Sequence, residues 1–377
     1  MGKDLISILD LQIVLDAIGF VQGITLGGLL LLLNRQKYRS SFFLGIFLIF
    51  FSLELLMYIF IHPDLSELFP QWYLLPFYFS WLLMPLFFVY TQQVSVLSQE
   101  KIKYWVLYPG ILVFVINVII FFLPFETKKM LYFNFWHDLL IWQFGTFYSW
   151  LIGFWNLRLL YRHKLEIENT YSQLTSKELI WARNLLIYLL ATSMISYSLS
   201  YIFNSLPNHT VYLAAMDIIA IYLFSYFGIV QRNIRSLLNE DNGMFKLTSK
   251  ITKASETMVV DKFKDEALMQ QINDYISNSE CYTNQNLTIV DLADAMNIHP
   301  KRISTAINLI QGQNFNTYIN QFRIKKAEKL LLSDVSENLS IEGIANESGF
   351  NSKSAFYMAF KKFNGKTPHQ FLTKVKA

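Results

Sequence analysis

The sequence is poor in charged residues and in cysteine. Only 16% of its 377 residues are charged, whereas a soluble globular chain usually carries about 25%. The single cysteine, Cys281, excludes an intramolecular disulfide framework and any metal site built from several cysteines. With 15 Gly and 9 Pro, the chain is neither collagen-like nor a low-complexity repeat. The composition therefore excludes a disordered chain and argues against a conventional soluble enzyme.

Hydrophobic residues, by contrast, are abundant, and the charges are distributed unevenly. Hydrophobic residues make up 53% of the chain, and Phe alone occurs 33 times. Residues 1–240 hold 15 Lys/Arg and 14 Asp/Glu, whereas residues 241–377 hold 17 and 14 in little more than half the length. We therefore predict three parts: an apolar part at 1–235, a polar helical connector at 236–280, and a basic C-terminal domain at 281–377.

Seven apolar stretches in the first part are long enough to cross a bilayer, which takes about 20 residues. A set of buried helices in a large soluble core is the alternative, and seven such stretches in succession disfavour it. The first stretch is not a signal peptide, because Asp4 and Asp10 precede it where a signal peptide is basic. The prediction is an all-α fold, with a seven-span transmembrane helix bundle before the C-terminal domain. The stretches run approximately over 11–33, 41–61, 73–94, 104–125, 139–160, 184–206 and 211–230.

Lys and Arg in the connecting loops predict the orientation, because cytoplasmic loops carry an excess of both. Eleven lie on one side of the predicted spans and three on the other. The N-terminus is therefore predicted outside the cell and the C-terminal domain in the cytoplasm. The eleven are Arg35, Lys37, Arg39, Lys101, Lys103, Arg162, Lys164, Lys177, Arg183, Arg232 and Arg235, and the three are Lys3, Lys128 and Lys129.

Three acids, Asp16, Glu54 and Asp217, lie within the predicted spans. A charge at such a depth costs about 2.5–3.5 kcal/mol on insertion scales, so it normally faces the bundle interior and a partner. Arg158, near the cytoplasmic end of its span, is a candidate partner. Two interpretations stay open: the acids form a network that only fixes helix packing, or they line a signal site. An intramembrane enzyme would need a recognisable catalytic pairing, which the sequence does not show, so no enzymatic activity is predicted.

Motifs for other chemistry are missing from the sequence. It has no HExxH metal motif, no dinucleotide fingerprint, and no phosphorelay histidine box or acidic receiver pattern. His62, His137 and His209 fall in predicted outer loops, where scattered histidines are usually plain polar surface. We therefore predict neither a metal nor another cofactor.

The last hundred residues contain two copies of one helical pattern. The copy that begins at Ile289 recurs from Ile341, at an offset of 52 residues that grows to 53. Each copy predicts a short helix, a tight turn at Asn297 or Gly349, and a second helix. This is a helix-turn-helix pattern, whose second helix can lie in the major groove of double-stranded DNA.

Helical spacing divides each second helix into a buried face and an exposed face. The exposed faces carry small polar and basic side chains, which suit base edges and phosphates, together with a Tyr and a Met for thymine methyl groups. A solvated face of a protein-interaction module is the alternative, and the duplication of the pattern disfavours it. The predicted DNA-binding residues are Lys301, Arg302, Ser304, Thr305 and Asn308 in the first copy, and Lys353, Ser354, Tyr357, Met358, Lys361 and Lys362 in the second.

The stretch Leu287–Leu372 resembles the tandem helix-turn-helix domain of AraC/XylS-type transcription regulators. The resemblance implies two three-helix lobes joined by a linking helix, whose reading helices enter successive major grooves on one DNA face. By matching position, it implies reading by Lys301, Ser304 and Thr305, and by Ser354 and Met358. One departure is Asn297, where the family usually has Gly. The residues that carry the resemblance most specifically are Arg323, Ala327, Leu330, Leu331, Ala345, Gly349, Phe350, Phe356, Phe360, Lys361 and Gly365-Lys366-Thr367-Pro368.

A multispan part followed by such a domain is similar, more loosely, to membrane-bound regulators of this family from Bacteroidetes-like bacteria. The prediction is thus a one-component transcription regulator in the bacterial inner (cytoplasmic) membrane, with the lipid bilayer and promoter DNA as partners. Its membrane part would sense an unknown small-molecule or envelope signal. On DNA we expect a homodimer, with RNA polymerase as a further candidate partner. The competing prediction is a seven-span receptor or transporter with a protein-binding helical tail.

Overall fold

In the described residues of the chain, every regular element is helical, which agrees with the predicted all-α class. The computed structural model describes residues 2–33, 40–61, 69–99, 101–174, 177–202, 209–230, 262–333 and 339–376. An isolated β-bridge between Tyr171 and Thr288 is the sole strand-like pairing within these ranges. Outside them lie much of the predicted connector and several loop residues used for the orientation, namely Arg35, Lys37, Arg39, Arg232 and Arg235.

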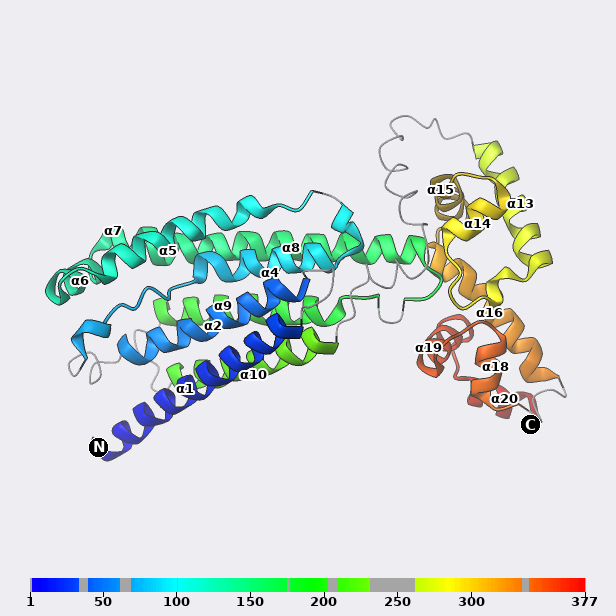
Figure 1. The fold of residues 1–377 in the computed structure, drawn as a ribbon. Coiled ribbons are helices and arrows are strands. Elements are labelled where there is room, and N and C mark those ends of the chain that lie inside the picture. The colour runs from blue at the N-terminus through cyan, green and yellow to red at the C-terminus, as the bar shows by residue number, and fades with distance from the viewer. Residues whose placement is uncertain are drawn as a thin grey trace. The chain divides into compact units, whose positions relative to one another are not determined.

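The chain forms two compact units that do not follow the order of the sequence (Figure 1). Unit 1 comprises Met1–Arg162 and Leu179–Leu237, and unit 2 comprises His163–Glu178 and Leu238–Ala377. A short stretch from within the apolar part, which we call the 163–178 segment, therefore belongs to the same unit as the helix-turn-helix pattern.

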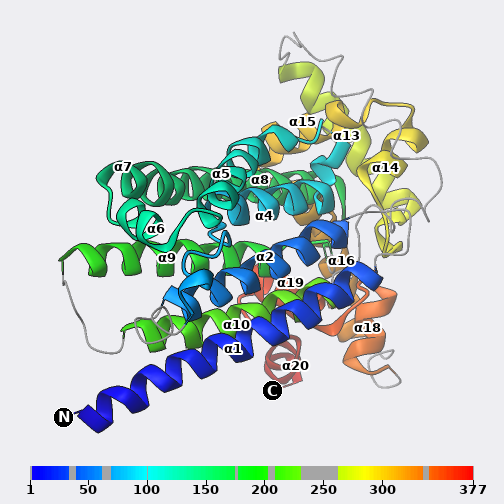
Figure 2. The same ribbon diagram turned by 60° about the vertical axis from the view of Figure 1, so that its left-hand side comes forward.

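Unit 1 is a bundle of long apolar helices around a core rich in phenylalanine. The Phe47 ring lies 4.9 Å from that of Phe224 and 5.8 Å from that of Phe87, measured between centroids. Figure 2 shows α1, α2 and α10 side by side, and these three helices pack against one another. The helices are α1 (Gly2–Leu33), α2 (Ser40–Ile61), α4 (Ser80–Val94), α5 (Tyr108–Phe121), α6 (Phe125–Tyr132), α7 (Phe135–His137), α8 (Phe144–Thr170), α9 (Ile180–Ile202) and α10 (His209–Val230).

Four described helices are long and apolar enough to cross a membrane, so the predicted count of seven is not confirmed. They overlap the first, second, fourth and seventh predicted stretches. The third stretch is helical only over Ser80–Val94, and 15 residues of α-helix rise about 22 Å, less than the hydrocarbon thickness of about 30 Å. α8 and α9 are long enough but more polar. The four are Leu11–Leu32, Phe42–Ile61, Tyr104–Phe121 and Val211–Val230.

Unit 2 contains two hydrophobic cores joined by one helix, α16 (Phe315–Leu332). α16 contributes Ile319 to the first core and Ile324 to the second. Each core is completed by three further helices, which is the arrangement that the resemblance implies. α13 (Lys262–Ser279), which lies in the predicted connector, packs its Ile272 into the first core. The first lobe contains α13 (Lys262–Ser279), α14 (Ile289–Met296) and α15 (Pro300–Gln311), and the second contains α18 (Ile341–Glu347), α19 (Lys353–Asn364) and α20 (Pro368–Lys376).

A glycine on α1 allows the backbones of α1 and α2 to approach closely. A Cβ atom at Gly27 would lie 2.9 Å from the Gly45 carbonyl oxygen and 3.2 Å from the Ile49 nitrogen. A Cβ atom at the next residue, Gly28, would meet nothing within 4 Å. Small residues that admit close backbone contact are typical of packed membrane helices.

We expect Gly27→Ala to destabilise unit 1 by about 1–3 kcal/mol, because the added methyl group meets backbone atoms that move only if α2 moves. Gly28→Ala is the matched control and should leave stability unchanged or slightly raised. The measurement is the midpoint of thermal unfolding of the detergent-solubilised chain. Equal midpoints for the two variants would contradict the close contact between α1 and α2.

Candidate DNA-reading surface

Each lobe of unit 2 turns sharply before its second helix, at the two positions that the repeat predicts. Asn297 has φ 51° and ψ 43°, in the left-handed region that Asn tolerates. Gly349 has φ 93°, and a Cβ atom there would lie 2.6 Å from the Tyr282 carbonyl oxygen. Only glycine fits this second turn, because both its backbone conformation and its surroundings exclude a side chain.

Side-chain caps define where the two second helices begin. Ser352 Oγ accepts a hydrogen bond from the Ala355 nitrogen at 3.3 Å at the start of α19. At the start of α15, His299 Nδ1 accepts from the Lys301 nitrogen at 3.3 Å, and Pro300 occupies the first helical position. Ser is a common cap, whereas His is not among the preferred capping residues, so residue preferences do not predict the cap at His299.

The buried and exposed faces of α15 and α19 are those that helical spacing predicts. Ile303 and Ile307 are buried in α15, and Phe356 and Phe360 are buried in α19. Met358 is 70% exposed, which is an unusually open position for methionine. Of the predicted DNA-binding residues, Lys301, Arg302, Asn308, Lys353, Ser354, Met358, Lys361 and Lys362 are exposed, and Ser304, Thr305 and Tyr357 are partly exposed.

Some of these side chains are oriented by neighbours. Asn308 Nδ2 donates to Ser304 Oγ at 3.3 Å, one turn earlier on α15. Lys362 Nζ donates to Thr317 Oγ1 at 3.3 Å, which ties α19 to α16. α15 and α19 both pack against α16, so the relative position of their exposed faces depends on the packing around this helix.

Arg323 lies fully buried on α16, between the two cores. Its Nε donates to the Tyr282 carbonyl at 2.7 Å, and Nη2 donates to the Asn284 carbonyl at 2.8 Å. Ser172, in the 163–178 segment, accepts from Nη2 through Oγ at 2.9 Å and from Nη1 through its carbonyl at 3.1 Å. Burial lowers the pKa of Arg323 to about 10, so the guanidinium stays charged at neutral pH. All of these acceptors are uncharged oxygens, which offset the cost of burying the charge.

The 163–178 segment also contacts the backbone and amide side chains of the first lobe and α16. The Ser172 nitrogen donates to the Leu287 carbonyl at 3.1 Å, beside the Tyr171–Thr288 bridge. Asn316 Nδ2, on α16, donates to the Ser172 carbonyl at 2.8 Å. The contacts with Arg323 and Asn316 place Ser172 against the helix that joins the two lobes.

The two ends of this contact reach α15 and the turn that precedes α19. Asn308 Nδ2, on the exposed face of α15, donates to Asn169 Oδ1 at 3.5 Å. Gln173 Nε2 donates to Asn351 Oδ1, two residues before α19 begins. The amino-acid sequence does not predict this contact, because polar side chains and backbone atoms without a periodic pattern make it.

In unit 1, the three acids lie on three helices that pack together. Asp16 on α1 and Glu54 on α2 are 3% and 7% exposed, so both point away from the bundle surface. Asp217 on α10 interacts electrostatically with both of them. Arg158 is exposed, and no ion pair joins it to these acids within the described part of the chain. The three acids therefore lie on helices that pack together, whereas Arg158, the candidate partner, does not pair with them.

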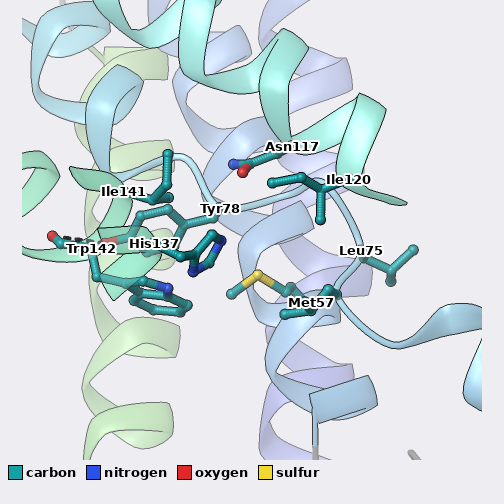
Figure 3. Close-up of a pocket in the computed structure, with 9 residues that line it drawn as sticks. Met57, Leu75, Tyr78, Asn117, Ile120, His137, Ile141 and Trp142 are labelled. Atoms are coloured by element: carbon teal, nitrogen blue, oxygen red, sulfur yellow. Dashed lines mark hydrogen bonds between the residues drawn. The ribbon is translucent and has the colours of Figure 1, made fainter. Parts of the chain in front are cut away.

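A second feature of unit 1 is a small cavity of about 20 Å³ (Figure 3). Asn117 and His137 line it, and neither Asn117 Nδ2 nor His137 Nδ1 has a hydrogen-bond partner among the described residues. This volume suits about one water molecule, which would satisfy both nitrogens. His62 and the side chain of His209 lie outside the described residues, within which no three His, Cys, Asp or Glu side chains gather as for a metal ion. The remaining lining residues are Met57, Leu74, Leu75, Tyr78, Ile120, Ile141 and Trp142.

Comparisons with known proteins place a helix-turn-helix domain at the C-terminal end. A family model described as a helix-turn-helix domain matches residues 292–374. The chain is 36% identical over 89 residues to the HTH-type transcriptional activator CfaD of Escherichia coli, which covers 24% of this chain and 32% of that protein. It is 26% identical over 122 residues to the Msm operon regulatory protein of Streptococcus mutans, covering 29% of this chain and 43% of that protein.

The chain thus spans less than half the length of these curated relatives. A solved structure of a protein of unknown function from Listeria innocua is 25% identical and covers 28% of this chain and 94% of that one. Its TM-score is 0.25, which is too low to support a statement about the fold.

His163 makes the packing of the 163–178 segment sensitive to acid. The ring is 1% exposed, its Nε2 lies 3.0 Å from the Lys177 carbonyl oxygen, and burial lowers its pKa to about 4. Because this value lies below the unfolded value of 6.5, the unfolded segment binds more protons between these limits. We therefore expect the packing to be fully stable above about pH 6.5 and to weaken as the pH falls towards 4, by about 2 kcal/mol at pH 5.

The measurement is hydrogen–deuterium exchange of residues 163–174, normalised to that of α13, at pH 7.5 and pH 5. We expect the segment to lose protection at pH 5 in the parent chain. His163→Gln is the control, because it keeps a donor and does not titrate. An acid response that persists in His163→Gln would assign the effect to another group.

Proposed function

We propose that the chain is a membrane-anchored one-component transcription regulator whose C-terminal domain reads promoter DNA. The observation that carries this proposal is the pair of helix-turn-helix lobes on one continuous helix, each with a polar and basic face exposed on its second helix. The matched helix-turn-helix family model supports DNA binding. The names of the two curated relatives, a transcriptional activator and an operon regulatory protein, support a role in transcription.

Reading of bases and binding of phosphates would be divided among the exposed residues. Ser304 and Thr305 on α15, and Ser354 and Met358 on α19, have the short polar or apolar side chains that discriminate base edges. The Lys and Arg side chains beside them would supply the phosphate contacts that position the domain. Because one rigid helix joins the lobes, two successive major grooves would be read as one site. A homodimer and RNA polymerase stay proposed partners on this DNA.

The apolar part would hold the regulator in the bacterial inner membrane and receive the signal. Four described helices with the length and apolar character of membrane spans support the anchoring. The 163–178 segment lies in a loop that the Lys/Arg distribution assigns to the cytoplasm, and it belongs to the same unit as the DNA-reading helices. This agreement supports an N-terminus outside the cell and a cytoplasmic C-terminal domain. The three gathered acids are the proposed signal-responsive site.

The DNA proposal predicts different effects for base-reading and phosphate-binding residues. Thr305→Ala and Met358→Ala should each relax base preference in a different half of the site, by about 1–3 kcal/mol per lost contact. Lys361→Ala should weaken binding to all sequences and reduce the salt dependence. The measurement is selection of duplexes from a random pool by the full chain in lipid nanodiscs, followed by titration at several salt concentrations.

Leu332→Ala is the control for Met358→Ala, because Leu332 is a similarly exposed apolar residue at the end of α16. It should leave both affinity and base preference unchanged. Equal affinity of the parent chain for selected and random duplexes would refute sequence-specific reading and favour the protein-binding tail.

The sensing proposal predicts that replacing one of the three carboxyl groups disturbs the response. Asp16→Asn, Glu54→Gln and Asp217→Asn keep the size of each side chain and remove its charge. At least one should lock a transcriptional reporter on or off, because a ligand shifts an equilibrium only through its different affinity for the two states. Membrane-fraction immunoblots must show normal protein levels. If all three variants respond as the parent does, or fail only by losing protein, the acids serve helix packing.

A further inference from the structure

Unit 2 carries a surface that holds an extended peptide, and the occupant is the chain's own 163–178 segment. Ser172 forms hydrogen bonds with the surface through three of its groups: its backbone nitrogen, its carbonyl oxygen and its hydroxyl group. Tyr171, Ser172 and Gln173 are all buried. Directional bonds from backbone and side chain together distinguish this contact from a loop that only lies near a surface.

The surface lies between the two predicted reading helices. Asn308, which binds the segment at Asn169, is itself one of the predicted DNA-binding residues. Asn351, which binds it at Gln173, lies two residues before α19. Between these points the segment contacts Asn316 and Arg323 on α16. If α15 and α19 enter successive major grooves on one DNA face, as the resemblance implies, the DNA backbone between these grooves would cross this region.

We propose that the 163–178 segment and DNA compete for this surface, so that the docked segment keeps the reading helices from DNA. This inference rests on the proposed function and adds how that function is controlled. The segment continues α8, which is one unbroken helix from Phe144 to Thr170, and α9 begins at Ile180 soon after it. A displacement of α8 therefore acts directly on the docked residues, because Tyr171 follows its last residue. A signal releases the DNA-reading surface to the extent that it favours the undocked state.

The first arm of the test loosens the segment in the full chain in nanodiscs. Ser172→Pro removes the nitrogen donor to the Leu287 carbonyl and the hydroxyl acceptor for Arg323. We expect it to tighten binding to the selected duplex about tenfold, which corresponds to about 1.4 kcal/mol. Ser172→Ala keeps the nitrogen donor, so its effect should be smaller and in the same direction. Leu165→Ala, at an exposed position of α8, is the control and should bind DNA as the parent does.

The second arm locks the segment in place. Gln173→Cys and Asn351→Cys are combined in a Cys281→Ser background, which removes the native cysteine. A disulfide should form on mild oxidation, as measured by loss of free thiols. The oxidised chain should lose binding to the selected duplex at least tenfold, and reduction should restore it. Either single-cysteine variant should show no such redox response.

The outcomes separate this inference from the function on which it rests. Failure of the disulfide to form, weaker DNA binding by Ser172→Pro, or equal binding by the oxidised and reduced chains would each overturn the competition. If the disulfide forms but the reduced chain and Ser172→Pro select no duplex at all, the proposed DNA-binding function fails, and the competition fails with it. Tighter binding on loosening and reversible loss on locking would establish the competition.

Discussion

The arrangement of unit 2 depends on one buried charge, the guanidinium of Arg323. A charge without a counter-ion is tolerated in a protein interior only if its donors are satisfied, and Arg323 is surrounded by carbonyl and hydroxyl oxygens. Two of these come from the loop before α14, through Tyr282 and Asn284. A Cβ atom at Gly349 would lie 3.0 Å from Arg323 Nε, so the turn of the second lobe packs against the same group. The need to provide hydrogen-bond acceptors for Arg323 thereby holds the first-lobe loop, α16 and the second-lobe turn in one relative position.

The local features of the two lobes follow from the sequence, because they depend on neighbours within a few residues. The left-handed turns at Asn297 and Gly349 and the buried faces of α15 and α19 required only residue preferences and helical spacing. α13 was assigned to a connector instead, because its apolar residues, such as Ile272, gain a partner only when the first lobe has formed. Whether the exposed residues touch DNA, and where the three predicted parts divide, stay predictions.

The predicted number of membrane spans is not confirmed, and one reason is that apolar character does not guarantee a helix. Residues 73–94 form one apolar stretch in the sequence, yet α4 begins only at Ser80. Pro76 lies before it and disfavours helical backbone at the preceding residue, while Leu74 has φ 54°, outside the right-handed helical region. In α8 and α9 the helix forms, but its apolar character is too low. Both are long helices whose polar residues exclude them from the four candidate membrane spans.

The 163–178 segment shows why a long-range contact between polar groups is the hardest feature to predict. Ser172 and Arg323 are 151 residues apart, and no periodicity or motif around Ser172 distinguishes it from other loop residues. The buried arginine nevertheless supplies a physical reason for the contact to matter. Withdrawal of Ser172 removes two acceptors from the guanidinium, and an unsatisfied buried donor costs about 1–3 kcal/mol. An energy of this size is small enough for a ligand or a helix shift to overcome and large enough to change a population about tenfold. The same bonds that complete the packing around Arg323 are therefore suited to connect the apolar part of the chain to the predicted reading helices.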